Sequence, residues 1–194
     1  MDQNCCIRMA RAEDAQALAD IFRPYVLETA VAFEYNPPGA GHFRELIENR
    51  LRKYPFLVAE ENGEIMGYLY VSPFKARPAY DWAIETSIYI RRECRGKGYG
   101  RMLHDRMEEL LKKQNILSMY ACIAYTEVED QYLVNHSKRF HTHMGYELTA
   151  TFPKCGYKFN KWYDIIWMHK EIGQHGDDPA PIIPITELDD PILR

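Results

Sequence analysis

The sequence predicts a single α/β domain of the α+β type, built from about seven strands and several helices. Short apolar segments rich in β-branched and aromatic residues recur along the chain and predict the strands. Between them lie stretches in which apolar residues recur every three or four positions, which is the spacing of an amphipathic helix. A length of 194 residues suits one domain with a sizeable core.

The N-terminal part of the chain predicts one short strand followed by two helices. Residues 7–9 form the strand, and apolar side chains at helical spacing predict a helix over residues 13–28. Two prolines and a glycine within residues 35–39 break regular structure. A second amphipathic helix covers residues 43–51 and ends before Pro55.

Three strands and a longer helix follow. Residues 56–60 and 65–71 predict a hairpin, because Asn62 and Gly63 between them tolerate the positive φ angles of a two-residue turn. After a polar and aromatic loop, the next strand covers residues 83–90. A loop rich in arginine and glycine then opens an amphipathic helix.

The C-terminal part of the domain predicts three strands and one more helix. The preceding helix ends near Gln114, residues 117–124 form a strand, and residues 132–144 have helical character. The last two strands cover residues 146–152 and 164–170 and flank a loop. Residues 1–172 are therefore expected to form the domain. The remaining residues, 173–194, are acidic and rich in proline, which predicts an extended tail.

Charge and hydropathy exclude several classes of protein. The chain has 24 basic and 28 acidic side chains and a net charge of −4, without the excess of cations that a nucleic-acid surface needs. No apolar run approaches the roughly 18–20 residues of a membrane span. Residues 1–14 lack the apolar core of an export signal. We therefore expect a cytoplasmic protein without nucleic-acid or membrane partners.

The five cysteines agree with a reducing compartment. Their number is odd, and their spacing matches neither a disulfide framework nor a metal motif. Cys122 lies in an apolar strand and is expected in the core, whereas Cys94 lies in the glycine-rich loop, where it can be exposed. No histidine partner is fixed by sequence, so catalytic cysteine chemistry is disfavoured.

The strongest chemical signal is the run Arg95-Gly96-Lys97-Gly98-Tyr99-Gly100 between a strand and a helix. Its glycines let backbone amides approach a ligand without Cβ obstruction, and the helix start that follows attracts anions. Arg91, Arg92 and Arg101 add positive charge. The loop therefore predicts a cofactor that carries phosphate groups.

Other cofactors fit this loop less well. A P-loop needs Gly-Lys followed by Ser or Thr, but here Gly98 follows Lys97, so the magnesium ligand is missing. The dinucleotide fingerprint has the spacing G-x-G-x-x-G, which the glycines at 96, 98 and 100 do not match. An ordinary glycine-rich turn is the remaining alternative.

This run matches the (Gln/Arg)-x-x-Gly-x-(Gly/Ala) element of Gcn5-related N-acetyltransferases. Over residues 7–171 the chain resembles the phosphinothricin and methionine-sulfoximine acetyltransferase group of that superfamily. The segments that carry the resemblance, in matching order, are Tyr54 to Glu60, Lys75 to Trp82, Glu85 to Ile90 and Gly156 to Lys158.

The resemblance implies a mixed sheet that is splayed in the middle, with acetyl-coenzyme A (acetyl-CoA) in the gap. The backbone of Ile88, Tyr89 and Ile90 would pair with the pantetheine arm, and the amides from Arg95 to Arg101 would hold the pyrophosphate. A homodimer is also implied by resemblance.

Glu85 is the expected general base. An ammonium substrate must lose a proton before its nitrogen can attack a thioester, and a carboxylate can accept that proton directly or through water. The alternative is an ordinary strand glutamate that faces solvent or pairs with a cation.

His141 is the second catalytic candidate, because the resemblance places it where relatives protonate the departing thiolate. Histidine can supply a proton near neutral pH. The alternative is a helix histidine with a purely structural hydrogen bond. A metal site from His136, His141 and His143 is not expected, since positions i and i+2 point to different sides of a helix.

The link formed by residues 125–134 is longer than the corresponding link in the group. The spacing of Asn135 and Ser137 is shifted as a result, so the resemblance implies only weakly that these two residues contact the cofactor. The acidic residues of the long link are expected near the acceptor pocket.

The acceptor pocket is predicted from cationic and aromatic residues. Lys75 and Arg77 can bind a substrate carboxylate or oxyanion, although a solvated loop is the alternative. The aromatic residues that can line the pocket are Phe33, Tyr80, Trp82 and Tyr157, with plain core packing as the alternative for all four and above all for Trp82.

The sequence thus predicts an acetyl-CoA-dependent enzyme that acetylates the primary amine of a small amino acid or amino-acid analogue. A protein N-terminal acetyltransferase, another small-amine acetyltransferase and a non-catalytic coenzyme-A-binding sensor remain alternatives. The first needs an open peptide groove, and the sensor would not need both Glu85 and His141.

Overall fold

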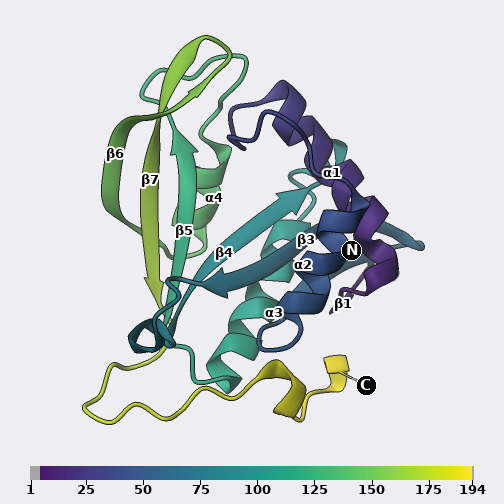
Figure 1. Cartoon of the computed structure of the whole chain (residues 1–194), viewed down its shortest axis with the longest axis vertical. Helices are drawn as coiled ribbons and strands as arrows, with labels where there is room; N and C mark the ends of the chain where they lie inside the picture. Colours follow the sequence, from purple (N-terminus) through teal and green to yellow (C-terminus); the bar gives the residue numbers. More distant parts are fainter. Residues whose placement is uncertain (1–4, 194) are drawn as a thin grey trace.

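The computed structural model describes residues 5–193, arranged as one sheet with helices on both faces (Figure 1). The expected domain and tail also include residues 1–4 and 194, which lie outside the described part. The strands are β1 (Cys5–Met9), β2 (Phe56–Glu61), β3 (Glu64–Pro73), β4 (Ala83–Ile90), β5 (Ser118–Tyr125), β6 (Glu147–Lys158) and β7 (Lys161–Glu171). The helices are α1 (Ala15–Glu28), α2 (Ala40–Arg50), α3 (Tyr99–Lys113) and α4 (His136–His143).

The sheet has seven strands in the order β1-β2-β3-β4-β5-β7-β6. Every neighbouring pair is antiparallel except β4 and β5, which are parallel. The mixed α+β sheet predicted from the sequence is therefore confirmed.

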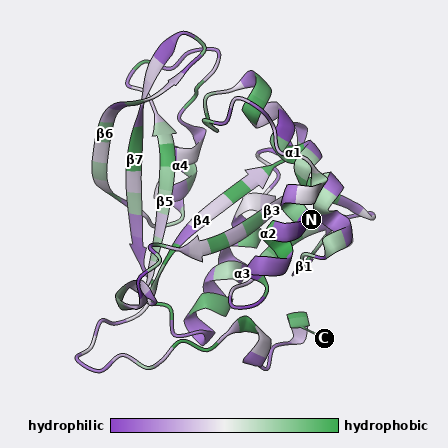
Figure 2. Ribbon diagram, in the orientation of Figure 1, coloured by the Kyte–Doolittle hydropathy of each residue, from purple (hydrophilic) through white to green (hydrophobic). Residues whose placement is uncertain are grey.

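Two apolar clusters on opposite faces of the sheet form most of the core. One joins α1 and α2 to β2 and β3 through Phe22, Phe43, Ile47 and Tyr68. The other packs α3 against the opposite face, where Leu103 is among the fully buried side chains. Hydrophobic residues accordingly appear as bands along the strands and helices (Figure 2).

The hairpin predicted between β2 and β3 is confirmed. Asn62 and Gly63 have φ angles of 52° and 80°, so the turn uses the left-handed conformations that this residue pair tolerates.

The predicted loop between the last two strands is wrong. β6 continues to Lys158 and β7 begins at Lys161, so Phe159 and Asn160 form the turn. Both have positive φ angles, 50° and 59°, without the glycine that usually signals such a turn. Irregular register between Phe152 and Gly156 lets the strand run through that stretch.

The tail expected to be extended crosses below the C-terminal end of α3, at the bottom of Figure 1. The buried carboxylate of Asp190 pairs with Arg106 and with Lys113, 2.7 Å from the latter. Ile185 is 1% exposed and belongs to the core cluster of α3. The tail residues are thus part of the packed structure.

Candidate active site

The fork between β4 and β5 is the central feature of the sheet. These strands pair only from Ala83 to Glu85, opposite Ser118 to Tyr120. At the branch point the hydroxyl of Thr86 donates to the carbonyl oxygen of Tyr120 over 3.1 Å. Beyond it the strands diverge (Figure 1), so the rest of this β4 edge has no strand partner within residues 5–193.

A cavity of about 830 Å³ adjoins the open part of β4. It lies between the glycine-rich loop, the end of α1, α4 and the segment that precedes α4. Its lining includes most of the predicted cofactor residues, namely Ile88, Ile90, Arg95, Gly96, Gly98, Tyr99, Gly100, Arg101 and Ser137. The structure therefore brings together residues that are far apart in the sequence.

The glycine-rich loop forms one end of the cavity. Gly96 and Gly98 have φ angles of 77° and 96°, and apart from their chain neighbours no described residue has an atom within 4 Å of the place where their Cβ atoms would be. α3 begins at Tyr99, so its first amide groups follow the loop directly. This open cradle fits a pyrophosphate, whose charge the amides and helix start would stabilise.

Three predicted cofactor residues do not line the cavity. Lys97 is exposed, and the side chain of Tyr89 points to the other face of β4, where its ring is 4.7 Å from that of Phe22. The side-chain amide of Asn135 donates to the carbonyl oxygen of Thr126 over 2.8 Å. Asn135 therefore braces the preceding segment.

Tyr25 is a cavity residue that sequence reasoning missed. Its hydroxyl donates to the carbonyl oxygen of Ile90 over 2.5 Å, and its ring lies 4.9 Å from the Arg95 guanidinium carbon. In the sequence, Tyr25 is one of the residues at helical spacing that predict the helix over residues 13–28. The available signal was its hydroxyl, because a buried tyrosine needs a polar partner.

Glu85 lies on β4 at the base of the fork, half-buried on the face that α1 and α2 cover. Burial raises the pKa of this carboxyl, and the charge of nearby Lys75 partly opposes the shift. A raised pKa makes the carboxylate a better proton acceptor.

His141 is buried in α4, with 4% of its surface exposed. Its Nδ1–H group donates to the carbonyl oxygen of Ser137 over 2.8 Å, and its Nε2 atom has no partner among the described residues. Burial lowers the pKa to about 4, which the bond to Ser137 only partly offsets. The imidazole is therefore neutral near pH 7, which argues against the expected role as proton donor.

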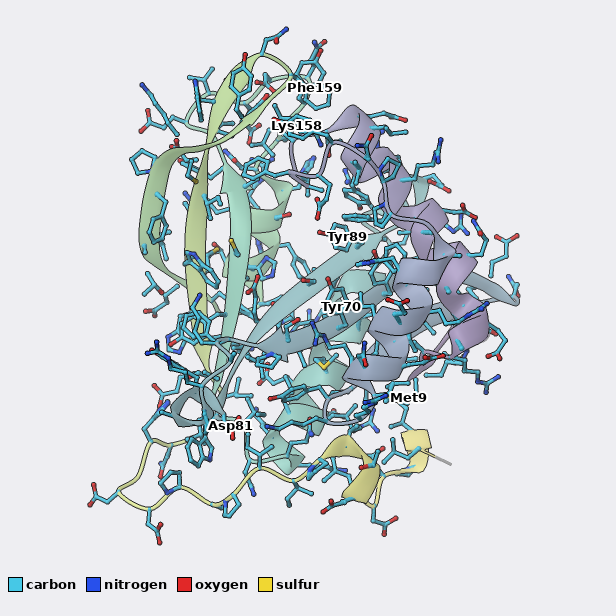
Figure 3. All side chains as sticks on the ribbon, viewed as in Figure 1. Met9, Tyr70, Asp81, Tyr89, Lys158 and Phe159 are labelled. Carbon is cyan, nitrogen blue, oxygen red and sulfur yellow. The ribbon has the colours of Figure 1, made fainter. Side chains whose placement is uncertain are left out.

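The predicted acceptor residues fall into two groups at opposite ends of the splayed sheet. Phe33 packs against Gly156, where a Cβ atom would lie 2.3 Å from the ring, and the Tyr35 hydroxyl bonds to the Tyr157 carbonyl over 2.6 Å. These residues adjoin Lys158 and Phe159 in the upper part of Figure 3.

The second group lies near Asp81, in the lower part of Figure 3. It consists of Lys75, Arg77 and Tyr80, all exposed. The Lys75 ammonium lies 5.0 Å from the centre of the Phe74 ring. This group contains Lys75, whose positive charge acts on Glu85 and opposes the rise of its pKa.

Three further expectations are corrected by burial and contacts. Cys122 is exposed, because it alternates along β5 with the buried Ala121 and Ile123 and so points away from their core cluster. Cys94 is buried, 3.5 Å from the sulfur of Met66. The Trp82 indole donates to the carbonyl oxygen of Ala180 over 2.8 Å, so Trp82 contacts the tail.

Within residues 5–193 no helix is both long and apolar enough to cross a bilayer. In the same part of the chain, no three His, Cys, Asp or Glu side chains are grouped as metal ligands.

The forked sheet, the glycine-rich cradle and the carboxylate at the fork define an acyltransferase that uses a phosphate-bearing cofactor. Residues 7–167 match the acetyltransferase (GNAT) domain, and the chain belongs to this family. GNAT acetyltransferases use acetyl-CoA.

Comparison with individual proteins points to amino-acid acetyltransferases. The chain is 30% identical to phosphinothricin N-acetyltransferase of Streptomyces viridochromogenes, over 94% of this chain and 95% of that protein. It is also 30% identical to the L-amino acid N-acyltransferase MnaT of Escherichia coli, over 90% of this chain and 98% of that protein. The structure of a phosphinothricin acetyltransferase from Sinorhizobium meliloti in complex with AcCoA is similar, with a TM-score of 0.83 and 28% sequence identity. The match covers 95% of this chain and 98% of that chain.

Proposed function

We propose that this protein transfers an acetyl group from acetyl-CoA to the primary amine of a small amino acid or amino-acid analogue of the phosphinothricin or methionine-sulfoximine type. The observation that carries the proposal is Glu85, a half-buried carboxylate at the fork with the Lys75 cation nearby. Two relatives at 30% identity, named for phosphinothricin and L-amino acids, support this acceptor class.

The chain's own residues account for cofactor binding. Backbone amides of Gly96, Gly98 and the first turn of α3 would hold the pyrophosphate. The unpaired edge of β4 from Ile88 to Ile90 would bind the pantetheine arm. Acetyl-CoA supplies the thioester from which the acetyl group is transferred.

Glu85 removes a proton from the ammonium group of the acceptor, directly or through water, so that the nitrogen lone pair becomes available. Lys75 stabilises the ionised form of Glu85 and can attract the acid group of the acceptor. Arg77, exposed on the same loop, is the second cation for that group. At neutral pH the imidazole of His141 is neutral, so in this proposal the protein leaves the thiolate to depart unprotonated.

Release of free thiol from acetyl-CoA, followed across a panel of amines, tests the proposal. The panel should contain phosphinothricin, methionine sulfoximine, ordinary amino acids, their decarboxylated amines and an N-terminal peptide. We expect the fastest release with carboxylated small amines. Preference for the peptide would instead favour the protein N-terminal alternative.

We also propose that the protein is a cytoplasmic homodimer. Exposed apolar side chains gather on β6 and β7, among them Leu148, Phe152, Tyr157 and Trp162. Such a surface suits burial against a second copy. The described cysteines are all unpaired, which suits a reducing compartment. Sedimentation of the wild type and of a Phe152→Glu variant tests the dimer.

A further inference from the structure

Residues 125–135, between β5 and α4, form a structured wall of the cofactor cavity. Gln131, Tyr132 and Val134 line the cavity together with Ile88 and Ile90 of β4. The helix expected from Tyr132 is wrong, because α4 begins only at His136. The preceding residues follow an irregular path that side-chain hydrogen bonds hold.

The carboxylate of Asp130 organises this path by accepting hydrogen bonds from four groups. One oxygen accepts from the backbone amides of Tyr132 and Leu133, each over 2.8 Å. The other accepts from the Lys161 ammonium over 2.6 Å and the Tyr163 hydroxyl over 3.2 Å, both on β7. Asp130 therefore joins the wall to the β6–β7 hairpin. The carboxylate of Asp130 thus makes its hydrogen bonds within the protein, whereas the acidic residues of this segment are expected from the sequence near the acceptor pocket.

Tyr132 connects the same wall to the segment that follows α1 and to the β6–β7 turn. Its ring stacks on that of Phe159, with centres 4.1 Å apart and planes 5° from parallel. Its carbonyl oxygen accepts a hydrogen bond from the amide of Ala30 over 2.9 Å. Leu133, 1% exposed, packs beside Ala30 and Tyr163. The position of Tyr132 in the cavity thus depends on three elements.

Gln131 lies next to this anchor and is exposed in the cavity lining. Its side-chain amide makes no hydrogen bond within residues 5–193, whereas that of Asn135 is occupied by Thr126. An amide can both donate and accept, and the pantetheine arm of coenzyme A contains two amide groups that require such partners.

We propose that residues 125–135 form one wall of the pantetheine site, with Gln131 hydrogen-bonded to the arm and Asp130 as the positioning residue of the wall. The inference depends on acetyl-CoA being the cofactor but not on the identity of the acceptor.

Binding of two probes by calorimetry tests this proposal. Coenzyme A carries the pantetheine arm, and adenosine 3′,5′-bisphosphate lacks it. Gln131→Ala should weaken coenzyme A binding about tenfold and leave the bisphosphate affinity unchanged. Asp130→Asn should behave in the same way, because it removes the charge that holds Lys161 while the side chain keeps its shape. Glu127→Gln, an exposed charge removal in the same segment, is the matched control and should affect neither probe.

Kinetics provide a second readout. We expect both variants to raise the KM for acetyl-CoA with little change in kcat at saturation, since Glu85 is untouched. Equal weakening of both probes, or normal coenzyme A affinity in Gln131→Ala, would overturn the proposal. If Asp130→Asn does not fold, the Gln131→Ala result still decides. Because these titrations contain no acceptor, they remain valid even if the proposed acceptor class is wrong.

Discussion

The ammonium group of Lys158 donates a hydrogen bond to the backbone carbonyl of Val26, 2.6 Å away. It also donates to the carbonyl oxygens of Thr29 and Ala32, over 3.0 and 2.6 Å. Carbonyl oxygens at the C-terminal end of a helix lack intrahelical donors. The Lys158 ammonium provides hydrogen-bond donors for such oxygens at the C-terminal end of α1. Burial lowers the pKa of the Lys158 ammonium. The end of β6 is thereby tied to α1 beside the cavity (Figure 3).

Replacement of Lys158 by methionine should destabilise the fold. The variant keeps the apolar stem but leaves buried carbonyl oxygens without donors, which costs about 1–3 kcal/mol. Denaturant unfolding measures the change. Lys154→Met, at an exposed position of the same strand, is the control and should change stability little. Equal midpoints for the two variants would mean that the three hydrogen bonds contribute nothing net.

Substitution of Gly98 should weaken cofactor binding. Valine at this position would be strained at a φ of 96° and would place its side chain in the cradle. We expect acetyl-CoA affinity to fall by at least ~2 kcal/mol, about thirtyfold. Gly63→Val is a matched control, because Gly63 has a φ of 80° and open space but lies in the β2–β3 turn. If calorimetry gives the two folded variants the same affinity, the loop does not hold the cofactor.

Stability should fall as the pH is lowered from 6.5 towards 4. Burial lowers the pKa of both His104 and His141 from 6.5 to about 4. Between these values the unfolded chain binds more protons than the folded one, so the stabilisation present above pH 6.5 is lost on acidification. Each histidine contributes a slope of up to about 1.4 kcal/mol per pH unit.

Unfolding curves at several pH values measure this slope. His141→Gln should flatten it, whereas His143→Gln, at an exposed site on the same helix, should leave it unchanged. A slope in His141→Gln identical to that of the wild type would show that His141 is protonated equally in both states.

Arg77 should distinguish acceptors by their acid group. Charge-assisted hydrogen bonds contribute roughly 1.5–3 kcal/mol, so Arg77→Ala should raise the KM of a carboxylated acceptor about tenfold or more. The corresponding amine without the carboxylate should respond little. Steady-state kinetics with both acceptors measure this, and Arg52→Ala, another exposed arginine, is the control. If both acceptors respond equally, Arg77 supports the structure or the cofactor.

Local signals in the sequence were sufficient for most of the fold. The spacing of apolar residues located α1 and α3 closely, and the Asn62-Gly63 pair located a turn, because these features act over a few residues. The turn at Phe159 and Asn160 has a weaker signal, since Asn160 tolerates positive φ but Phe159 does not, and no glycine follows.

Features that depend on distant contacts could not be predicted in this way. The irregular path before α4 depends on Asp130 and its hydrogen-bond partners on β7, which lie about thirty positions away. Tyr25 reaches the cavity only because α1 packs beside the end of β4. The glycine-rich loop could be predicted because its chemistry is contiguous in sequence, whereas the two groups of acceptor residues lie at opposite ends of the splayed sheet.

Acetyl transfer to phosphinothricin or methionine sulfoximine by the wild type and by Glu85→Gln is the most direct test of the account. Mass spectrometry of the amine detects the product, and calorimetry confirms that the variant still binds acetyl-CoA. We predict an N-acetylated product with the wild type and a rate about 10²–10⁴ lower for Glu85→Gln. Activity of the wild type should decline as the pH falls through the raised pKa of Glu85. Absence of acetylated product with every amino-acid acceptor, or a normal rate in the variant, would contradict the account.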